Sequence, residues 1–144
     1  MVLDPTRVIS GSFGEIHYDG QWATNFTSGE LTTDITYEEV GRSGTRSVGH
    51  KATSVKHSGS IKGYKVTSGF AGKVAQITDD TKGAFVTEII MKLADPEAYG
   101  HERVRIKGVQ FTRIDVIRFE HGSIVEEEWP FVCEGWEYLD KITE

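Results

Sequence analysis

Alternating apolar and polar residues dominate this chain and predict a protein built mainly from β-strands. Residues 13–18 alternate in this way, and Asp19 and Gly20 follow as a two-residue turn before residues 21–22 resume extended character. Residues 24–40 are rich in threonine, aromatic and β-branched side chains, which fit a pleated surface. The first part of the chain therefore predicts a short hairpin followed by one long strand.

Four further segments carry strand patterns: residues 60–66, 84–93, 101–119 and 129–134. In the longest of them the apolar phase slips at Gly108, as a bulge or bend requires. Because a strand of that length exceeds what one small sheet can use, it must bend or cross between sheets. In the last segment a proline, Pro130, cannot donate a ladder hydrogen bond, so we expect that strand at an edge or bulge.

One segment changes from the strand period to the helical one. Thr67 or Ser68 can cap a helix whose apolar residues fall on one stripe at i, i+4 and i+7, namely Phe70, Val74 and Ile77. Two glycines weaken this helix, each by about 1 kcal/mol relative to alanine, so we expect it to depend on packing against a sheet. Strands nevertheless outnumber helices. The pattern predicts a mainly β fold, a sandwich or barrel with one packed α-helix and a long extended loop.

The extended loop is the segment 41–59, which has few apolar residues to pack against a core. We predict an exposed loop or hairpin arm there, within a single domain that spans residues 1–144. At this length a single domain buries roughly 68% of the surface that its unfolded chain exposes. The arm carries the candidate contact residues Arg42, Arg46, His50, Lys51 and Lys56.

Charge is strongly segregated along the sequence. Residues 40–78 hold seven of the 16 basic side chains and none of the 22 acidic ones, although the whole chain has a net charge of −6. Three interpretations of the arm stay open: a solvated loop, a self-association element that meets an acidic body, or a nucleic-acid contact. Against the last, the arm has no aromatic residue between Tyr37 and Tyr64 on which a base could stack.

A run of three glutamates, Glu126, Glu127 and Glu128, is the most acidic short segment. Consecutive residues of a strand point to opposite faces, so the three are unsuited to act as paired catalytic carboxylates. Solvated charge is the default interpretation. If the run is functional, we expect it to face a basic partner or to line a channel that repels polyanions.

Catalytic and metal-binding patterns are missing from the sequence. It has no P-loop, dinucleotide-binding glycine motif or nucleophile elbow, and its five histidines do not have the spacing of a metal motif. The single cysteine, Cys133, lies in an alternating apolar run and is expected to act as a small buried hydrophobe. We therefore expect no enzymatic activity, no cofactor and no metal. A chain with a single cysteine, which forms no internal disulfide, also fits a reducing cytosol.

Membrane segments and export signals are likewise not expected. The start of the chain, residues 1–5, lacks the basic and apolar regions of a cleaved signal, and no apolar run is long enough to cross a bilayer.

Two regions resemble the phage tail tube proteins of the PBSX-like prophage type. The first contains Gly41-Arg42, then Gly49-His50-Lys51-Ala52-Thr53, then the run from Gly59 to Ser68. The second contains Glu102-Arg103-Val104, and Glu126-Glu127-Glu128 leading into Pro130-Phe131. With Ile9-Ser10-Gly11 near the start, the resemblance spans nearly the whole chain, and none of these motifs is catalytic.

The resemblance implies a structural subunit of a contractile tail or of a phage-tail-like bacteriocin. Such proteins form hexameric rings whose inner strands join into a continuous barrel around a lumen, and the rings stack inside a sheath. A long loop between strands reaches a neighbouring subunit, and the arm at 41–59 occupies the matching place. The implied partners are other copies of the chain, a sheath protein, a baseplate and a tape measure protein, with DNA present only in passage.

The implied location is the tail of a virion or phage-like particle, after assembly in the host bacterial cytoplasm. The alternative function, from another class, is a single-stranded nucleic-acid-binding β-barrel module, motivated only by the cations of the arm. A third alternative, a small-ligand barrel or enzyme, has no positive feature beyond the β-rich pattern.

Overall fold

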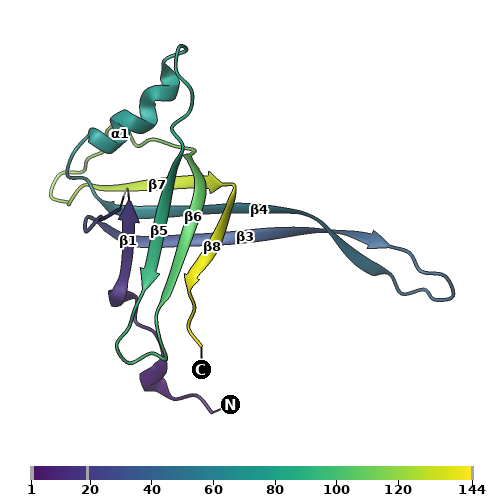
Figure 1. Cartoon of the computed structure of the whole chain (residues 1–144). Coiled ribbons are helices and arrows are strands. Elements are labelled where there is room, and N and C mark those ends of the chain that lie inside the picture. Colours follow the sequence, from purple (N-terminus) through teal and green to yellow (C-terminus); the bar gives the residue numbers. More distant parts are fainter. Residues whose placement is uncertain (1, 19, 144) are drawn as a thin grey trace.

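The computed structural model describes residues 2–18 and 20–143, and most of its regular structure is β-strand (Figure 1). The eight strands are β1 (Gly14–Tyr18), β2 (Gln21–Trp22), β3 (Phe26–Val40), β4 (Gly49–Tyr64), β5 (Thr87–Leu93), β6 (Glu102–Phe111), β7 (Glu126–Cys133) and β8 (Gly135–Asp140). The helical elements are α1 (Gly69–Val74) and the 3-10 turns η1 (Pro5–Arg7), η2 (Gly11–Phe13) and η3 (Ala75–Thr78). The predicted mainly β fold is confirmed. Asp19 of the predicted turn lies outside the described residues, whereas Gly20 has the positive φ of 75° that such a turn needs.

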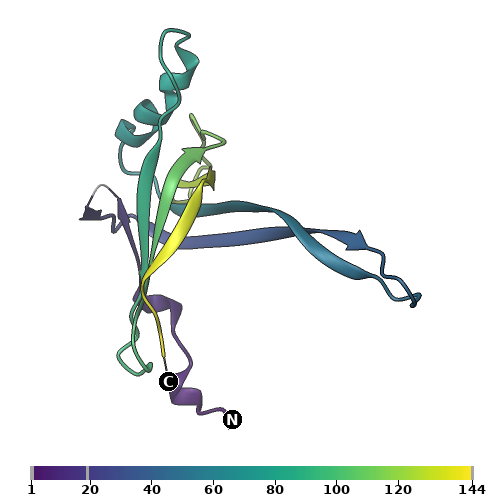
Figure 2. The ribbon, with the colours of Figure 1, turned by 45° about the vertical axis from the view of Figure 1, so that its right-hand side comes forward.

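The strands form two antiparallel layers that cross one another (Figures 1 and 2). Sheet A has the order β2-β1-β5-β6-β8, and sheet B joins the end of β6 to β7, β4 and β3. Strand β6 belongs to both sheets, because Gln110 and Phe111 at its end pair with β7. The change occurs at Gly108, whose φ of 65° suits glycine. The predicted bend and crossing between sheets is thus confirmed.

Several boundaries differ from the prediction. Strand β6 ends at Phe111, and residues 112–119 form irregular structure because Thr112 is the last residue whose N–H bonds to β7, at the carbonyl of Pro130. Strand β8 was not predicted. The edge position predicted from Pro130 is wrong, since β7 lies between β4 and the end of β6. The backbone carbonyl and the ring nitrogen of Pro130 both face β6. Because the nitrogen carries no hydrogen, it cannot donate to β6, and the β6–β7 ladder ends there.

The core lies where the two sheets cross. Its buried residues come from five strands and the helix: Ile16, Ile61, Val74, Ile89, Ile106, Val109, Trp129 and Phe131. Phe70 of α1 connects the helix to this core, because its ring makes edge-on contacts with Tyr18, Phe26, Phe111 and Trp129. As expected, the short helix depends on packing against the sheets.

Two details of the helix prediction need correction. Ser68 is the residue before the helix, but its side chain makes no capping hydrogen bond, and the neighbouring Thr67 Oγ1 accepts from the Gly69 N–H at 3.4 Å instead. The helix tightens into η3 after Val74, which turns Ile77 away from the core and leaves it 53% exposed.

Cross-strand ion pairs cover the outer face of sheet A. Val104 and Ile106 face the core, so the basic residues that alternate with them on β6 face outward, as the alternation predicts. Arg103 Nε lies 2.6 Å from the Asp140 carboxylate, and an Arg105 guanidinium nitrogen lies 2.8 Å from that of Glu88. Hydrogen bonds from these two arginines lower the pKa of Asp140 and of Glu88 below their ordinary values.

The first prediction concerns the close packing of Gly59 in β4. A Cβ there would overlap the carbonyl oxygen of Glu30 and lie 2.9 Å from the ring of Phe131. Gly59→Ala should therefore lower the free energy of unfolding by about 1–3 kcal/mol, measured by urea denaturation of the monomer. Gly72→Ala in α1 is the matched control, since its Cβ meets nothing within 4 Å; it should raise stability by about 0.5–1 kcal/mol. Equal effects of the two substitutions would contradict this account.

The second prediction concerns pH. A carboxylate whose pKa is lowered on folding contributes stability above its unfolded pKa, and this is lost as pH falls through the folded pKa. The free energy of unfolding should therefore decline as pH drops below the ordinary values of 4.5 for Glu88 and 3.8 for Asp140. The double variant Glu88→Gln, Asp140→Asn should show a flatter decline in acid titrations of stability. Asp80→Asn, at an exposed carboxylate with no ion pair in the described part of the chain, is the matched control.

Candidate assembly surfaces

The outer halves of β3 and β4 form a two-stranded hairpin that projects from the body (Figure 1). Strand β7 pairs with β4 only from Tyr64 back to His57, so beyond that point β3 and β4 pair only with each other. Residues 41–48 connect the two strands at the far end. Of the two predicted forms of the arm, the hairpin is the one observed, and the arm also includes residues 34–40 of the outgoing strand.

Strand β4 begins at Gly49, although strand character was predicted only from residue 60. The first half of β4 has one large apolar residue, Val55, so an apolar alternation is almost undetectable in its sequence. It is a strand because its backbone pairs with β3, and the register runs from Val40 opposite Gly49 to Asp34 opposite Lys56. The predicted arm covered residues 41–59; from here on, the arm means residues 34–56, as the structure shows it.

The register places acidic residues of β3 opposite the basic residues of β4. Lys56 lies opposite Asp34, Lys51 opposite Glu38 and His50 opposite Glu39. From residue 30 to residue 59 the hairpin carries four acidic and four basic side chains. The charge segregation of the sequence is therefore not a segregation in space. This removes the observation that motivated the nucleic-acid-binding alternative.

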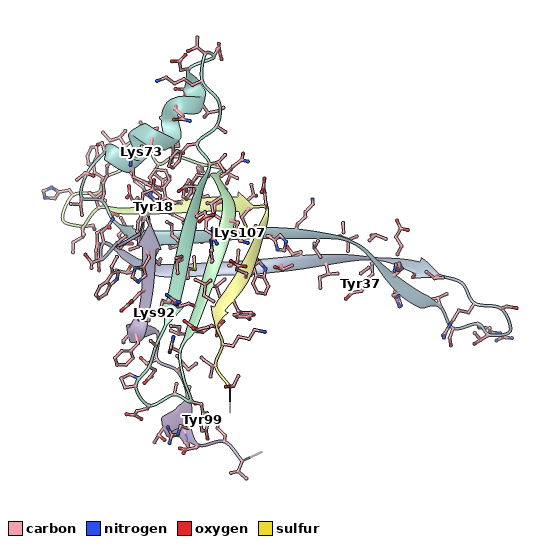
Figure 3. All side chains as sticks on the ribbon, in the orientation of Figure 1. Tyr18, Tyr37, Lys73, Lys92, Tyr99 and Lys107 are labelled. Atoms are coloured by element: carbon pink, nitrogen blue, oxygen red, sulfur yellow. The ribbon has the colours of Figure 1, made fainter. Side chains whose placement is uncertain are left out.

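One face of the arm is apolar and exposed. Side chains two positions apart share a face, and Leu31 on β3 packs against the core. Further along the same face lie Ile35 and Tyr37, which are 49% and 58% exposed, and Val55 opposite Ile35 is 55% exposed. Figure 3 shows Tyr37 on the arm, away from the body. The face that forms the core within the body thus continues outward without a cover.

Hydrogen bonds fix the arm to the body at its base. The Trp136 indole N–H of β8 donates to Thr33 Oγ1 at 2.8 Å, and the same oxygen lies 2.9 Å from His57 Nδ1 across the β3–β4 pair. Three strands from two sheets therefore meet at one hydroxyl. Because a rigid base reduces the entropy lost on docking, this contact favours an arm with a defined direction.

The three consecutive glutamates lie at the start of β7, at the end of β4 remote from the arm. Their side chains alternate as expected: Glu126 is exposed, Glu127 is only 5% exposed, and Glu128 lies 3.9 Å from Lys62 and 3.4 Å from Arg113. Glu127 is more enclosed than an interpretation as solvated charge predicts. Its inward direction was set by the same alternation that buries Trp129 and Phe131.

Two hollows adjoin these surfaces. The first, of about 610 Å³, lies between β3 and sheet A and is lined mainly by apolar side chains, among them Ile16, Met91, Val104 and Trp136. The second, of about 780 Å³, is polar and is lined by Lys62 and residues of the segment 118–128, including Glu126, Glu127 and Glu128. We call the second one the acidic hollow.

Neither hollow holds a catalytic arrangement. Within the described residues no three His, Cys, Asp or Glu side chains are placed to hold a metal ion. Burial raises the pKa of the Cys133 thiol, which disfavours the thiolate that a nucleophile needs. No described helix is long and apolar enough to cross a membrane.

The fold matches that of solved injection-system tube components. The chain superimposes on a chain of the tube-terminating cap of the anti-feeding prophage with a TM-score of 0.73, at 11% identity and over 98% of this chain and 95% of the other. A chain of an extracellular contractile injection system, solved as a sheath-tube complex in its extended state, gives 0.70 at 11% identity, over 94% and 93%. The fold is therefore that of contractile-injection-system tubes.

Sequence comparison identifies the family. Residues 1–140 match the family described as phage tail tube protein, and the chain belongs to it. Two curated relatives come from Bacillus subtilis (strain 168). One is the phage-like element PBSX protein XkdM, 27% identical over 100% of this chain and 99% of the relative. The other is the uncharacterized protein YqbM, 28% identical over 99% and 97%. The resemblance to PBSX-type tail tube proteins is confirmed, as is the structural, non-enzymatic role.

The third prediction tests the base of the arm. Trp136→Phe keeps an aromatic ring, although a smaller one, and removes the indole N–H that bonds to Thr33, so the free energy of unfolding should fall by about 0.5–1.5 kcal/mol. Amide exchange of the arm should become faster. Trp22→Phe is the control, because the Trp22 indole N–H has no hydrogen-bond partner among the described residues and its ring is 56% exposed. Unchanged exchange in Trp136→Phe would show that this bond does not fix the arm.

Proposed function

We propose that this tail tube subunit self-assembles into hexameric rings that stack around a central channel, with the arm of each copy contacting a neighbouring copy. The observation that carries the proposal is the uncovered apolar face of the arm, which includes Ile35, Tyr37 and Val55. An exposed row of this kind on a soluble chain marks an interaction surface. In a tube, another copy of the chain covers it.

Open strand edges support the same assembly. Strand β3 lies at one edge of sheet B, and β8 lies at an edge of sheet A. Such edges offer unpaired backbone groups, and pairing with an identical neighbour satisfies them. The apolar hollow runs along the open edge of β3, so a neighbouring strand there would gain apolar contacts as well as backbone hydrogen bonds.

The outward face of sheet B is suited to line the channel. Along β4 and β7, outward-facing residues alternate with buried ones such as Ile61 and Trp129. The outward side chains are small polar or charged ones, including Ser60, Lys62, Glu126 and Glu128. A polar surface with more carboxylates than cations does not adsorb polyanions, so DNA would be present only in passage.

The arm residues Arg42, Arg46, His50, Lys51 and Lys56 are proposed as part of the contact between copies. Complementary charges give such a contact register and specificity more than raw affinity. Since the hairpin as a whole carries no net charge, the apolar face supplies the main driving force in this proposal.

The proposed partners beyond other copies are a sheath protein, a baseplate and a tape measure protein. Solved chains of the same fold come from a sheath-tube complex and from an anti-feeding prophage baseplate. We place the protein in the tail of a phage or of a phage-like particle such as a bacteriocin, after assembly in the bacterial cytoplasm.

The fourth prediction tests the role of the arm in assembly. The register allows residues 35–55 to be replaced by Asn-Gly, which joins the opposed residues Asp34 and Lys56 through a two-residue turn. Electron microscopy and sedimentation should show rings or tubes for the full chain and only monomers for the shortened one. Unfolding of the shortened chain should keep its cooperativity, because the core lies outside the arm. Tubes of normal length without the arm, or no assembly of the full chain, would contradict the proposal.

A further inference from the structure

Glu127 is a largely buried residue whose carboxylate has no partner among the described residues of its own chain. The residue is 5% exposed and lines the acidic hollow, yet it forms no hydrogen bond or ion pair in the described part of the chain. The carboxylate opens into the acidic hollow, where it adds a negative charge that no cation of its own chain pairs with. A cation from outside the chain that enters the hollow would pair with it.

The cations near the hollow are already engaged with other carboxylates. Lys62 and Arg113 lie 3.9 and 3.4 Å from Glu128, and Arg118 lies 4.0 Å from Asp115. The lining has four glutamates against one lysine and one arginine. An incoming cation thus meets an excess of negative charge, and one of these carboxylates, that of Glu127, has no partner among the described residues.

Unpaired cations occur at the far end of the arm. Arg42 and Arg46 lie in the turn between β3 and β4, and neither makes an ion pair within the described residues. They are the basic residues of the arm that have no acidic residue opposite them in the register. A guanidinium is the side chain best suited to a carboxylate in a partly buried site, because it can donate two parallel hydrogen bonds.

A single chain cannot bring these groups together. The arm turn adjoins Gly49 of β4, whereas Glu126 pairs with Tyr64 at the other end of that strand. Fifteen residue steps of about 3.3 Å separate the two ends by roughly 50 Å. Figure 1 shows the arm turn and the start of β7 at opposite ends of sheet B. The cation and the carboxylate can meet only between two copies.

We propose that the turn of one copy's arm docks in the acidic hollow of the next copy, where Arg42 or Arg46 pairs with Glu127. This inference rests on the proposed tube assembly and names the surface that receives the arm. The contact joins two different patches at opposite ends of the chain, which is the head-to-tail arrangement that propagates rings or filaments. Val40 and Val48 beside the turn, and Phe119 and Ile124 at the hollow, are exposed apolar residues that the same contact would cover.

A double-mutant cycle on assembly tests the pairing. The variants are Arg42→Gln with Arg46→Gln, Glu127→Gln, and all three together, and the measurement is the critical concentration for tube formation by sedimentation. Because close charge pairs at interfaces show coupling that corresponds to about tenfold or more, each change alone should raise the critical concentration by at least that factor. The triple variant should be little worse than either. Lys82→Gln, an exposed cation outside the arm, is the matched control and should assemble normally.

Each outcome has a distinct meaning. Circular dichroism and urea unfolding first verify that Glu127→Gln is folded, and the turn variants lie in an exposed loop that leaves the core intact. Normal assembly of the turn variants, or strictly multiplicative effects in the triple variant, would overturn the docking inference while leaving the tube proposal in place. Loss of assembly in Glu127→Gln alone would assign a different cation to the hollow and overturn it as well. A wild-type chain that never forms rings or tubes would instead overturn the proposed function.

Discussion

The pairing of β3 with β4 is the constraint on which the rest of the structure depends. Fourteen cross-strand residue pairs extend from the centre of sheet B to the turn of the arm. Inside the body this ladder places Ile61 and Leu31 over the core, and Gly59 lets the Phe131 ring approach the backbone. Because side chains alternate with a period of two, the same register fixes which face of the arm is apolar. One set of backbone hydrogen bonds thus determines both the core and the proposed assembly surface.

Much of the fold could be predicted from the sequence, because most strands are half buried and their alternation is clear. The bend at Gly108 was detectable because Val104 and Ile106 are out of phase with Val109 and Phe111. Strand β8 was missed even though Trp136 and Tyr138 alternate with Glu137, a pattern strong enough to have found it. Strand β4 was predicted too short because its first half is exposed on both faces. For such a segment only the partner strand decides the conformation, and local periodicity has no information about the partner.

The candidate surfaces were harder to predict for a related reason. A run of cations without acids looks like a basic element, but the charge that matters is the charge around each group in space. The neutralising acids Asp34, Glu38 and Glu39 precede the run in sequence and return to it only through the hairpin register. Likewise, three consecutive glutamates look alike in sequence, yet the strand period buries the middle one. The resemblance to tail tube proteins identified the family correctly because it depends on the order of motifs and not on these local charges.

The balance of charge over residues 30–59 has a consequence for crowding. A polymer of identical chains brings many copies of each element close together, and copies of an element with a net charge of four would repel one another at short range. The hairpin avoids this because its four basic side chains between residues 30 and 59 are balanced by four acidic ones on β3. In the proposed tube, arms can therefore lie side by side at high local density, and salt has little like-charge repulsion to screen. The acids of β3 act in this sense as built-in counterions.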